Sequence, residues 1–323
     1  MRFVDSFLCF IAWLAVSLIS IIPIRIVALL GRLGGGVVYH IDVRHRRVAL
    51  RNLTDTFSKT KTPAEISGIV RENFRRIGEN ICSAIKIASM RPIDVERFFE
   101  VTETGSRAAS DAIQARNVVL ASGHFGGFEL FSQIAHRFPK FRVIATYRGI
   151  RQPGLDAFMR GLREKNGVVV LDRRTAPDQL KTELNGGGLM LILFADQSDR
   201  KNGLELPFLG RPAFTNRAPA VMALRYGCAL FVPICYRLGL GKYRIEMGEP
   251  IATHDAQGGR RSCEAITRDI NSALEAAILR DPANWFWVHN RWKQKLAPAK
   301  SSQQKAHPEL RAKATSEAAH QFP

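Results

Sequence analysis

Short runs of apolar residues, each about as long as one strand, recur from residue 117 onward. They cover 118–121, 141–146, 168–171, 189–195, 230–236 and 243–247. These runs are continuous rather than alternating, and segments with helical periodicity, such as 155–165 and 177–184, lie between them. Strands that are apolar on both faces and separated by helices are typical of parallel sheets covered on both sides. The sequence therefore predicts an α/β fold, with a largely parallel central sheet flanked by helices.

Two further helices are expected outside these runs. Residues 64–90 place Ile66, Val70 and Phe74 at the spacing of a helix core. Residues 266–278 repeat apolar side chains every four residues, and Asp281-Pro282 then ends the helix. Gly34-Gly35-Gly36 is expected to break the helical stretch that precedes the first of these helices.

The N-terminal segment 7–22 contains no charge and is followed by Pro23. A spanning helix needs about 20 residues, and tilt or neighbouring apolar residues can supply the small deficit. A cleaved signal peptide is the least favoured interpretation, because no small-x-small site follows the run. A buried core helix is the second. We favour an N-terminal membrane-anchor helix, either single-pass or embedded in one leaflet. Since the arginines cluster after the segment, the positive-inside rule places the rest of the chain in the cytoplasm.

These observations divide the chain into three parts. Residues 1–40 are expected to form the membrane anchor and an amphipathic segment, and 41–296 the main domain. Residues 297–323 contain mainly Ala, Lys, Gln and Ser with few apolar side chains, which predicts a disordered tail.

The charge balance predicts an anionic partner. The chain has 47 Lys and Arg against 29 Asp and Glu, a formal net charge of +18. Nucleic acid, an anionic membrane surface and a phosphorylated substrate all fit, as does a merely solvated basic surface. Arg44, Arg47 and Arg51 share one face of a helix, which suits lipid headgroup phosphates. RNP-like and helix-turn-helix signals are absent from the sequence, so no nucleic acid is expected.

The hexapeptide HFGGFE at residues 124–129 directly follows the apolar run 118–121. In open α/β sheets ligands bind beyond the carboxyl ends of the strands, where His124 falls. A carboxylate at Glu129 could accept from one ring nitrogen and leave the other as a general base. On a regular helix the two would lie about 140° apart, so this pairing requires His124 to precede the helix or sit in a distorted first turn. A structural histidine and a surface glutamate are the alternative.

Other catalytic chemistries lack their signatures. The sequence contains no GxSxG elbow, HExxH motif, clustered His and Cys, phosphate loop or dinucleotide fingerprint. The five cysteines lack CxxC spacing, which fits a reducing compartment and no metal site. A histidine base without a protein nucleophile would activate water or a substrate hydroxyl, and a hydroxyl acceptor with an activated acyl donor is the economical interpretation.

Several segments, in order, resemble one enzyme family. Residues 119–129 resemble the HX4(D/E) block of the glycerolipid and lysophospholipid acyltransferase superfamily, and 285–293 resemble the Trp-x-His-x-Arg-Trp/Phe-Lys signature of its lauroyl/myristoyl lipid A branch. The resemblance covers roughly residues 1–295. The other matching segments are 145–148, Arg163, 194–197, 207–215 and 248–251.

The resemblance implies a lipid A acyltransferase at the cytoplasmic face of the cell inner membrane. Acyl carrier protein would supply the acyl chain, and a hydroxyl on a hydroxyacyl chain of a Kdo-bearing lipid A precursor would accept it. The implied partners are acyl carrier protein, the lipid A precursor and the anionic membrane surface. No metal, other cofactor or covalent acyl-enzyme is implied.

The resemblance also implies roles for individual residues. His124 would take the hydroxyl proton, Glu129 would orient His124, and Arg163 would contact the thioester or the transition state. Asp196 would lie in the site without a defined role, with a turn-capping carboxylate as the alternative. The remaining substrate-binding candidates are Arg148, Thr215, Arg44, Arg47 and Arg51.

Some of these residues also have local interpretations. Thr215 suits the N-cap of a helix at 216–224. Trp285 and Trp287 alternate as in a half-buried strand, with core packing as their default, and we prefer a structural role for His289. Two other functions stay open: an acyltransferase for another lipid, such as a lysophospholipid or amino-acid lipid, and a basic membrane-associated binding protein without catalysis.

Overall fold

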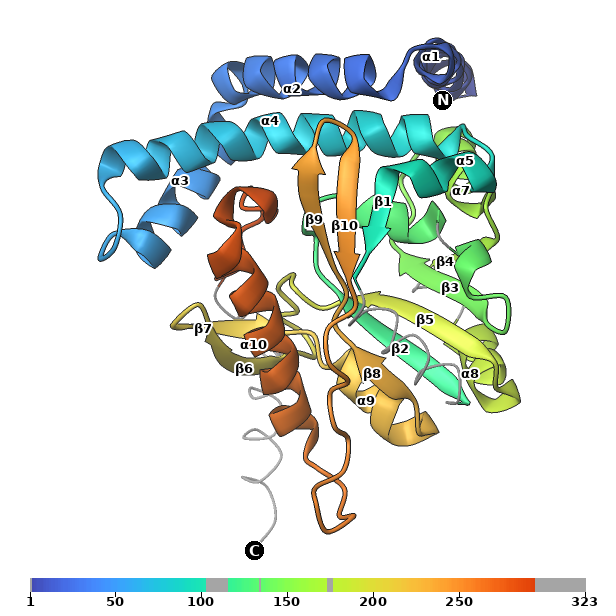
Figure 1. Ribbon diagram of the computed structural model, residues 1–323, viewed down its shortest axis with the longest axis vertical. Helices are drawn as coiled ribbons and strands as arrows, with labels where there is room; N and C mark the ends of the chain where they lie inside the picture. The colour runs from blue at the N-terminus through green and yellow to red at the C-terminus, as the bar shows by residue number, and fades with distance from the viewer. Residues whose placement is uncertain (1, 103–115, 134, 173–176, 294–323) are drawn as a thin grey trace, which may run out of the picture.

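The computed structural model describes residues 2–102, 116–133, 135–172 and 177–293 (Figure 1). The predicted disordered tail at 297–323 lies outside these residues. The described chain contains a central parallel sheet, a smaller mixed sheet and a β-hairpin, with helices packed around them.

The central sheet has five strands in the order β4-β3-β5-β2-β8, and every neighbouring pair is parallel. This confirms the predicted fold class. α7 (Pro153–Glu164) connects β3 to β4, and α8 (Pro177–Gly186) connects β4 to β5. The strands are β2 (Asn117–Ser122), β3 (Arg142–Tyr147), β4 (Val168–Asp172), β5 (Leu189–Phe194) and β8 (Ala229–Phe231).

Both faces of this sheet are buried, which explains its continuous apolar strands. In β2, Val119 and Ala121 join one hydrophobic core, while Val118 and Leu120 join a second core on the other face. The first core also receives buried side chains from α3 (Val43–Phe57), α4 (Pro63–Ala88), α9 (Ala218–Tyr226) and α10 (Cys263–Arg280). The predicted late helix corresponds to α10, whose Ile266, Ile270, Leu274 and Ile278 are all buried.

The predicted strand at 230–236 is two strands. β8 belongs to the central sheet, whereas β9 (Ile234–Gly239) pairs antiparallel with β10 (Lys242–Glu246), and β10 pairs with β1 (Phe99–Val101). Pro233 lies between β8 and β9 and has no N–H to donate to a ladder, so the run cannot continue as one strand. β6 (Leu204–Phe208) and β7 (Arg211–Thr215) form the separate hairpin.

The predicted break at Gly34–Gly36 is wrong, because α2 (Ile24–Ile41) runs through all three glycines. α2 lies along α4 (Figure 1), and a Cβ on Gly35 would overlap the Phe74 carbonyl oxygen of α4. A Cβ on Gly31 would likewise lie 2.6 Å from the Gly78 carbonyl oxygen. These glycines therefore allow two helix backbones to approach closely rather than ending the helix.

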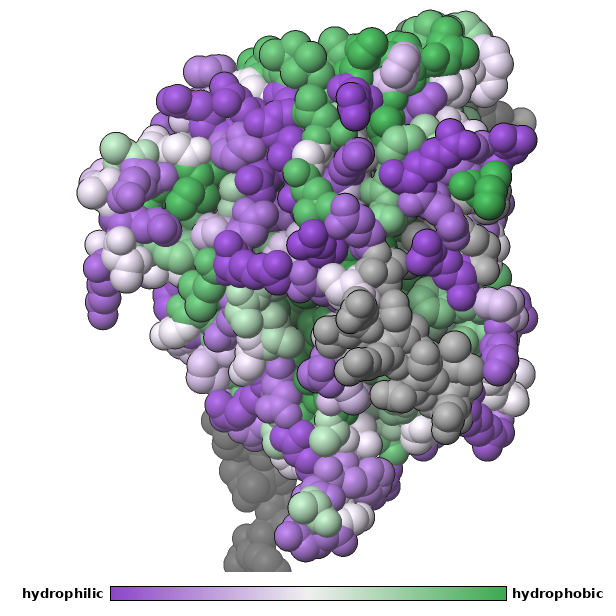
Figure 2. Space-filling model, viewed as in Figure 1, coloured by the Kyte–Doolittle hydropathy of each residue, from purple (hydrophilic) through white to green (hydrophobic). Residues whose placement is uncertain are grey.

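α1 (Arg2–Ile21) and α2 are long and apolar enough to cross a membrane, by length and composition alone. No residue of the 18-residue window in α1 is buried, and only 28% of the window in α2 is buried. Figure 2 shows the apolar surface gathered along the edge of the molecule that these helices form. Its large side chains include Phe7, Phe10, Trp13, Leu18, Ile21, Leu30, Leu33 and Val37.

Candidate active site

His124 lies two residues beyond the end of β2 and precedes the 3-10 helix η2 (Phe128–Gln133). His124 therefore stands before the helix, the position that a pair with Glu129 would have required. Gly126 turns the backbone with φ +55°, and a Cβ there would overlap the Cys235 carbonyl oxygen. Glycine is therefore required at this position, where the chain leaves the sheet and passes β9.

Asp196 holds His124 through two hydrogen bonds. The ring Nδ1 lies 2.8 Å from Oδ1, and the His124 backbone N–H donates to Oδ2, also at 2.8 Å. Asp196 follows β5, and Ser122 of β2 is in register with Phe194 of β5. The carboxyl ends of these parallel neighbours therefore bring together two residues that are 72 positions apart.

A third donor binds the same carboxylate. The indole Nε1–H of Trp285 donates to Asp196 Oδ2 at 2.9 Å, and both side chains are buried. Burial alone would raise the pKa of Asp196, but the charge of His124 and the hydrogen bonds from His124 and Trp285 outweigh it and lower the pKa to about 2. Asp196 is therefore ionised at neutral pH and accepts hydrogen bonds only.

This arrangement fixes the tautomer of His124. Because an ionised carboxylate can only accept, the proton of a neutral imidazole must reside on Nδ1, leaving a lone pair on Nε2. The ring packs against Phe194, Phe128 and Phe286, with centroid separations of 4.3, 4.8 and 6.0 Å. Gln197 Nε2 lies 3.4 Å from His124 Nε2. The site therefore presents an oriented base in largely apolar surroundings.

Glu129 does not occupy the position expected for the partner of His124. Its carboxylate accepts from Arg163 Nε at 2.9 Å and from Nη2 at 2.6 Å, a bidentate pair between η2 and the last turn of α7. The hydrogen bonds with Glu129, opposed by burial, raise the pKa of Arg163. The predicted pairing is corrected in this respect: Asp196 from the neighbouring strand binds Nδ1, and Glu129 binds Arg163.

Thr215 is not the N-cap of the following helix. α9 begins at Ala218, whose backbone N–H is capped by the Asn216 side chain at 3.0 Å. The buried Thr215 hydroxyl instead accepts from Arg291 Nη2 at 2.6 Å. Arg291 is fully buried and also donates to the Phe214 carbonyl, so it fixes the end of β7. A substrate-binding role for Thr215 stays a prediction.

The segment that carries Trp285 is an irregular turn rather than the predicted strand. Trp285 makes one isolated bridge with Phe125, and Trp287 lies in a turn. Both indoles are buried, which confirms core packing. Asn73 of α4 fixes this turn, because its Nδ2 donates to the Ala283 and Trp285 carbonyls at 2.9 and 2.6 Å. Periodicity gives no signal for these two contacts.

His289 has a structural position, as preferred from the sequence. Its Nε2 accepts from the backbone N–H of Ser198 at 3.3 Å, and burial lowers its pKa to about 4. The exposed Arg148 follows β3, and Arg44, Arg47 and Arg51 are exposed on α3. Their phosphate-binding roles stay predictions. Within the described ranges, no group of three or more His, Cys, Asp or Glu side chains is placed to hold a metal ion.

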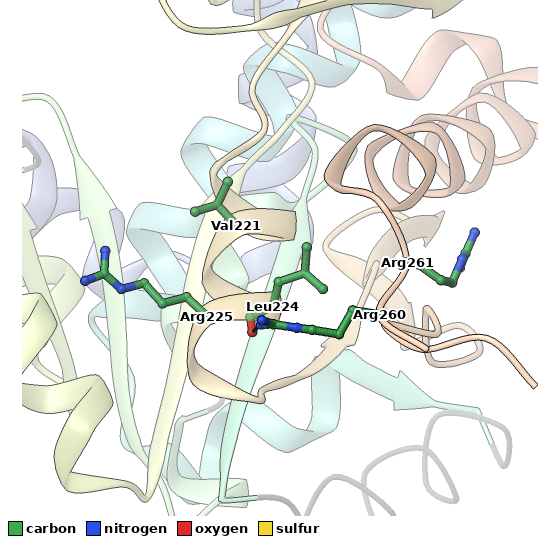
Figure 3. Close-up of a pocket in the computed structure, with 5 residues that line it drawn as sticks. All are labelled: Val221, Leu224, Arg225, Arg260 and Arg261. Carbon is green, nitrogen blue, oxygen red and sulfur yellow. Dashed lines mark hydrogen bonds between the residues drawn. The ribbon is translucent and has the colours of Figure 1, made fainter. Parts of the chain in front are cut away.

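A shallow pocket of about 480 Å³ lies at the C-terminal end of α9 (Figure 3). This end of α9 leads into the start of β8, whereas His124 follows the end of the parallel strand β2. Two of its three arginines make hydrogen bonds within the fold. Arg260 donates to the Leu224 carbonyl, and Arg261 donates to Asp269 at 2.7 Å. Figure 3 shows Arg225 and Arg261 pointing in different directions, so they do not converge on one ligand. The lining residues are Val221, Leu224, Arg225, Arg260 and Arg261.

Comparisons with known proteins agree with the sequence motifs. A family model of bacterial lipid A biosynthesis acyltransferases matches residues 1–294. A protein of Haemophilus influenzae named "Lipid A biosynthesis acyltransferase" is 25% identical over 293 residues, which cover 87% of this chain and 89% of that protein.

Proposed function

The chain belongs to the bacterial lipid A biosynthesis acyltransferase family, and on this premise we propose that it transfers a fatty acyl chain from acyl carrier protein to a hydroxyl on a hydroxyacyl chain of a Kdo-bearing lipid A precursor. The proposed acyl chain is of the lauroyl or myristoyl class, as in the branch that residues 285–293 resemble. The observation that carries this proposal is the hydrogen bond between His124 and the buried Asp196, which leaves Nε2 as an oriented base.

In the proposed reaction, His124 Nε2 removes the proton from the acceptor hydroxyl. Asp196 keeps the other ring proton on Nδ1 and stabilises the imidazolium that forms. The hydroxyl oxygen then attacks the thioester carbonyl, a C–O bond forms, and the carbonyl electron pair moves onto oxygen. When the tetrahedral intermediate collapses, the C–S bond breaks and the departing thiolate takes the proton from His124. The acyl chain is transferred directly, without an acyl-enzyme.

Two features would favour transfer over hydrolysis. Phe128, Phe194 and Phe286 surround the base with aromatic side chains, which would limit the access of water to the thioester. Arg163 would stabilise the negative charge on the carbonyl oxygen. Its bidentate pair with Glu129 uses two of its five N–H donors, and in this proposal the others would face the thioester. Glu129 then acts by positioning Arg163.

We propose that α1 and α2 attach the enzyme to the cytoplasmic face of the inner membrane. Their exposed apolar side chains form one surface (Figure 2), and the exposed Arg44, Arg47 and Arg51 on α3 would bind headgroup phosphates. At this location His124, at the end of the central sheet, would have access both to a lipid acceptor and to a cytoplasmic acyl carrier protein.

Of the two membrane topologies left open by the sequence, we favour the one embedded in a single leaflet. Asp5, near the start of α1, contacts Gly154 of α7, and the carbonyl of Ser20, near its end, accepts from Lys86 of α4. Both ends of α1 therefore contact the domain that holds His124. A helix crossing the bilayer would carry one end about 30 Å away from that domain. An N-terminal tag should be accessible to protease added from the cytoplasmic side, and exclusive periplasmic accessibility would overturn this topology.

Mass spectrometry of lipid A tests the proposed function. Deleting the gene should remove one secondary acyl chain of the lauroyl or myristoyl class, and a plasmid copy should restore it. A plasmid copy encoding His124→Ala should accumulate but fail to restore the chain. An unchanged acyl pattern in the deletion strain, together with altered phospholipids, would favour a different lipid acceptor.

A further inference from the structure

The catalytic-domain helix α7 has no N-terminal cap of its own. Its N-cap residue, Gln152, makes no side-chain capping hydrogen bond, and Pro153 in the first turn has no N–H. The next two backbone donors are those of Gly154 and Leu155. Both donate to the carboxylate of Asp5 on α1, at 2.9 Å to Oδ2 and 3.3 Å to Oδ1. A residue about 150 positions earlier in the chain therefore caps α7.

Asp5 is unusual in its own helix. α1 is otherwise the most apolar helix described, with a mean hydropathy of 2.1 over residues 4–21. A carboxylate costs free energy in such a helix unless it has a polar partner. The N-terminus of α7 is such a partner, since it offers two unpaired N–H groups and the positive end of the helix dipole.

The two helices are also shaped to meet at this point. A Cβ on Gly154 would lie 2.8 Å from Asp5 Oδ2 and 3.0 Å from Cys9 Sγ. Glycine leaves room for both side chains beside the first turn of α7, and a small side chain at this position would require only that the end of the Asp5 or Cys9 side chain shifts. At the other end of α1, the largely buried Lys86 donates to the Ser20 carbonyl, which holds the helix end near α4.

We infer that α1 contributes to the geometry of the active site and that Asp5 is a positioning residue for Arg163. Asp5 fixes the first turn of α7, and the last turn of the same 12-residue helix presents Arg163 to Glu129. A rigid helix transmits the position of one end to the other. This inference rests on the proposed function only for the role of Arg163; the contact between α1 and α7 does not depend on it.

A disulfide cross-link tests the contact without any substrate. In Gly154→Cys, the new Cβ would lie 3.0 Å from Cys9 Sγ, close to the separation of about 3 Å between a Cβ and the partner sulfur in a disulfide. Mild oxidation of membranes should therefore join residues 9 and 154, as read by peptide mass spectrometry. Gly161→Cys is the matched control, because its Cβ would have no atom within 4 Å. Absence of the 9–154 link, or equal linking of both variants to Cys9, would overturn the inference.

A pair of leucine substitutions tests the effect on catalysis. Asp5→Leu makes α1 more apolar, so membrane attachment should be kept or strengthened, while kcat for acyl transfer should fall about fivefold with KM unchanged. A fivefold loss of kcat corresponds to about 1 kcal/mol of transition-state stabilisation. Ser6→Leu, at the neighbouring exposed position, should leave kcat unchanged.

A double-mutant cycle separates positioning from general stability. If Asp5 acts through Arg163, then Asp5→Leu should cause no further loss of kcat in an Arg163→Ala background. Unchanged kcat in Asp5→Leu, or a fully additive loss in the double mutant, would overturn the positioning role. Failure of the proposed function would look different: the 9–154 cross-link would form, but the wild-type protein would transfer no acyl chain.

Discussion

Asp196→Asn tests the tautomer argument most sharply, because it keeps the size of the side chain. Three N–H donors converge on Asp196: the His124 backbone and the Trp285 indole on Oδ2, and His124 Nδ1 on Oδ1. An amide has only one oxygen. If it faces the two donors at the Oδ2 position, its NH2 group faces His124 Nδ1, which must then accept. The ring proton moves to Nε2, and the base is lost.

The size of this effect follows from the chemistry of the ring. A wrong histidine tautomer lowers kcat about 10⁴-fold in a catalytic triad, which is about 5.5 kcal/mol of transition-state stabilisation. We expect a loss of kcat on the order of 10³–10⁴ in Asp196→Asn, with the fold retained. The assay is single-turnover transfer from acyl carrier protein to the purified lipid A precursor, and ¹⁵N NMR of His124 would report the proton on Nε2.

Two comparison variants make the result interpretable. Asp199→Asn changes a neighbouring carboxylate that caps a turn at Lys201 and Asn202 and should leave kcat close to wild type. Glu129→Gln should weaken the pair with Arg163 but leave the His124 proton on Nδ1. Near-wild-type kcat in Asp196→Asn would refute the assignment of Asp196 as the partner of His124. A ring proton on Nε2 that appears in Glu129→Gln but not in Asp196→Asn would refute it as well.

Three further predictions concern the supports of the site. Trp285→Phe removes one of the hydrogen-bond donors that lower the pKa of Asp196. The acid limb of the pH–rate profile should therefore move to higher pH, and kcat should fall about tenfold. An unchanged pH–rate profile would contradict this role of Trp285. Gly35→Ala should lower the free energy of unfolding by more than about 1 kcal/mol through overlap with α4, whereas Gly36→Ala, with 3.8 Å to its nearest neighbour, should not; equal denaturation midpoints would refute this. Burial lowers the pKa of His289 from 6.5 to about 4. As pH falls from above 6.5 to 4 the unfolded chain takes up a proton that the folded protein resists, so the free energy of unfolding should drop by up to about 3 kcal/mol. His289→Gln should flatten this pH dependence.

The strands and long helices could be predicted because burial leaves a periodic pattern in the sequence. Continuous apolar runs located β2, β3, β4 and β5, whose side chains enter the two cores on either face of the sheet. β10 was located by a run in which buried apolar residues alternate with charged ones. The same reasoning failed at Gly34–Gly36. A glycine run looks like a break when the helix is considered alone, and only the approach of α4 shows why the helix continues.

In the candidate active site, the sequence located His124 but not the carboxylate that binds it. His124 could be found because it follows a recognisable strand, but the identity of its partner depends on strand order. β5 lies next to β2 because the sheet runs β4-β3-β5-β2-β8, and this order places Asp196 beside His124. Local spacing pointed to Glu129 instead. The indole of Trp285 reaches the same carboxylate from 89 positions away, a separation that no local pattern encodes.

The role of His124 as the base in direct acyl transfer can be tested with purified wild-type and His124→Ala enzymes. The substrates are acyl carrier protein carrying a fatty acyl chain and a Kdo-bearing lipid A precursor. The wild-type enzyme should add the mass of one acyl chain to the precursor. His124→Ala, folded to the same thermal midpoint, should do so at less than about a thousandth of that rate. Comparable rates in the two enzymes, or an acyl chain covalently attached to the protein during turnover, would contradict it.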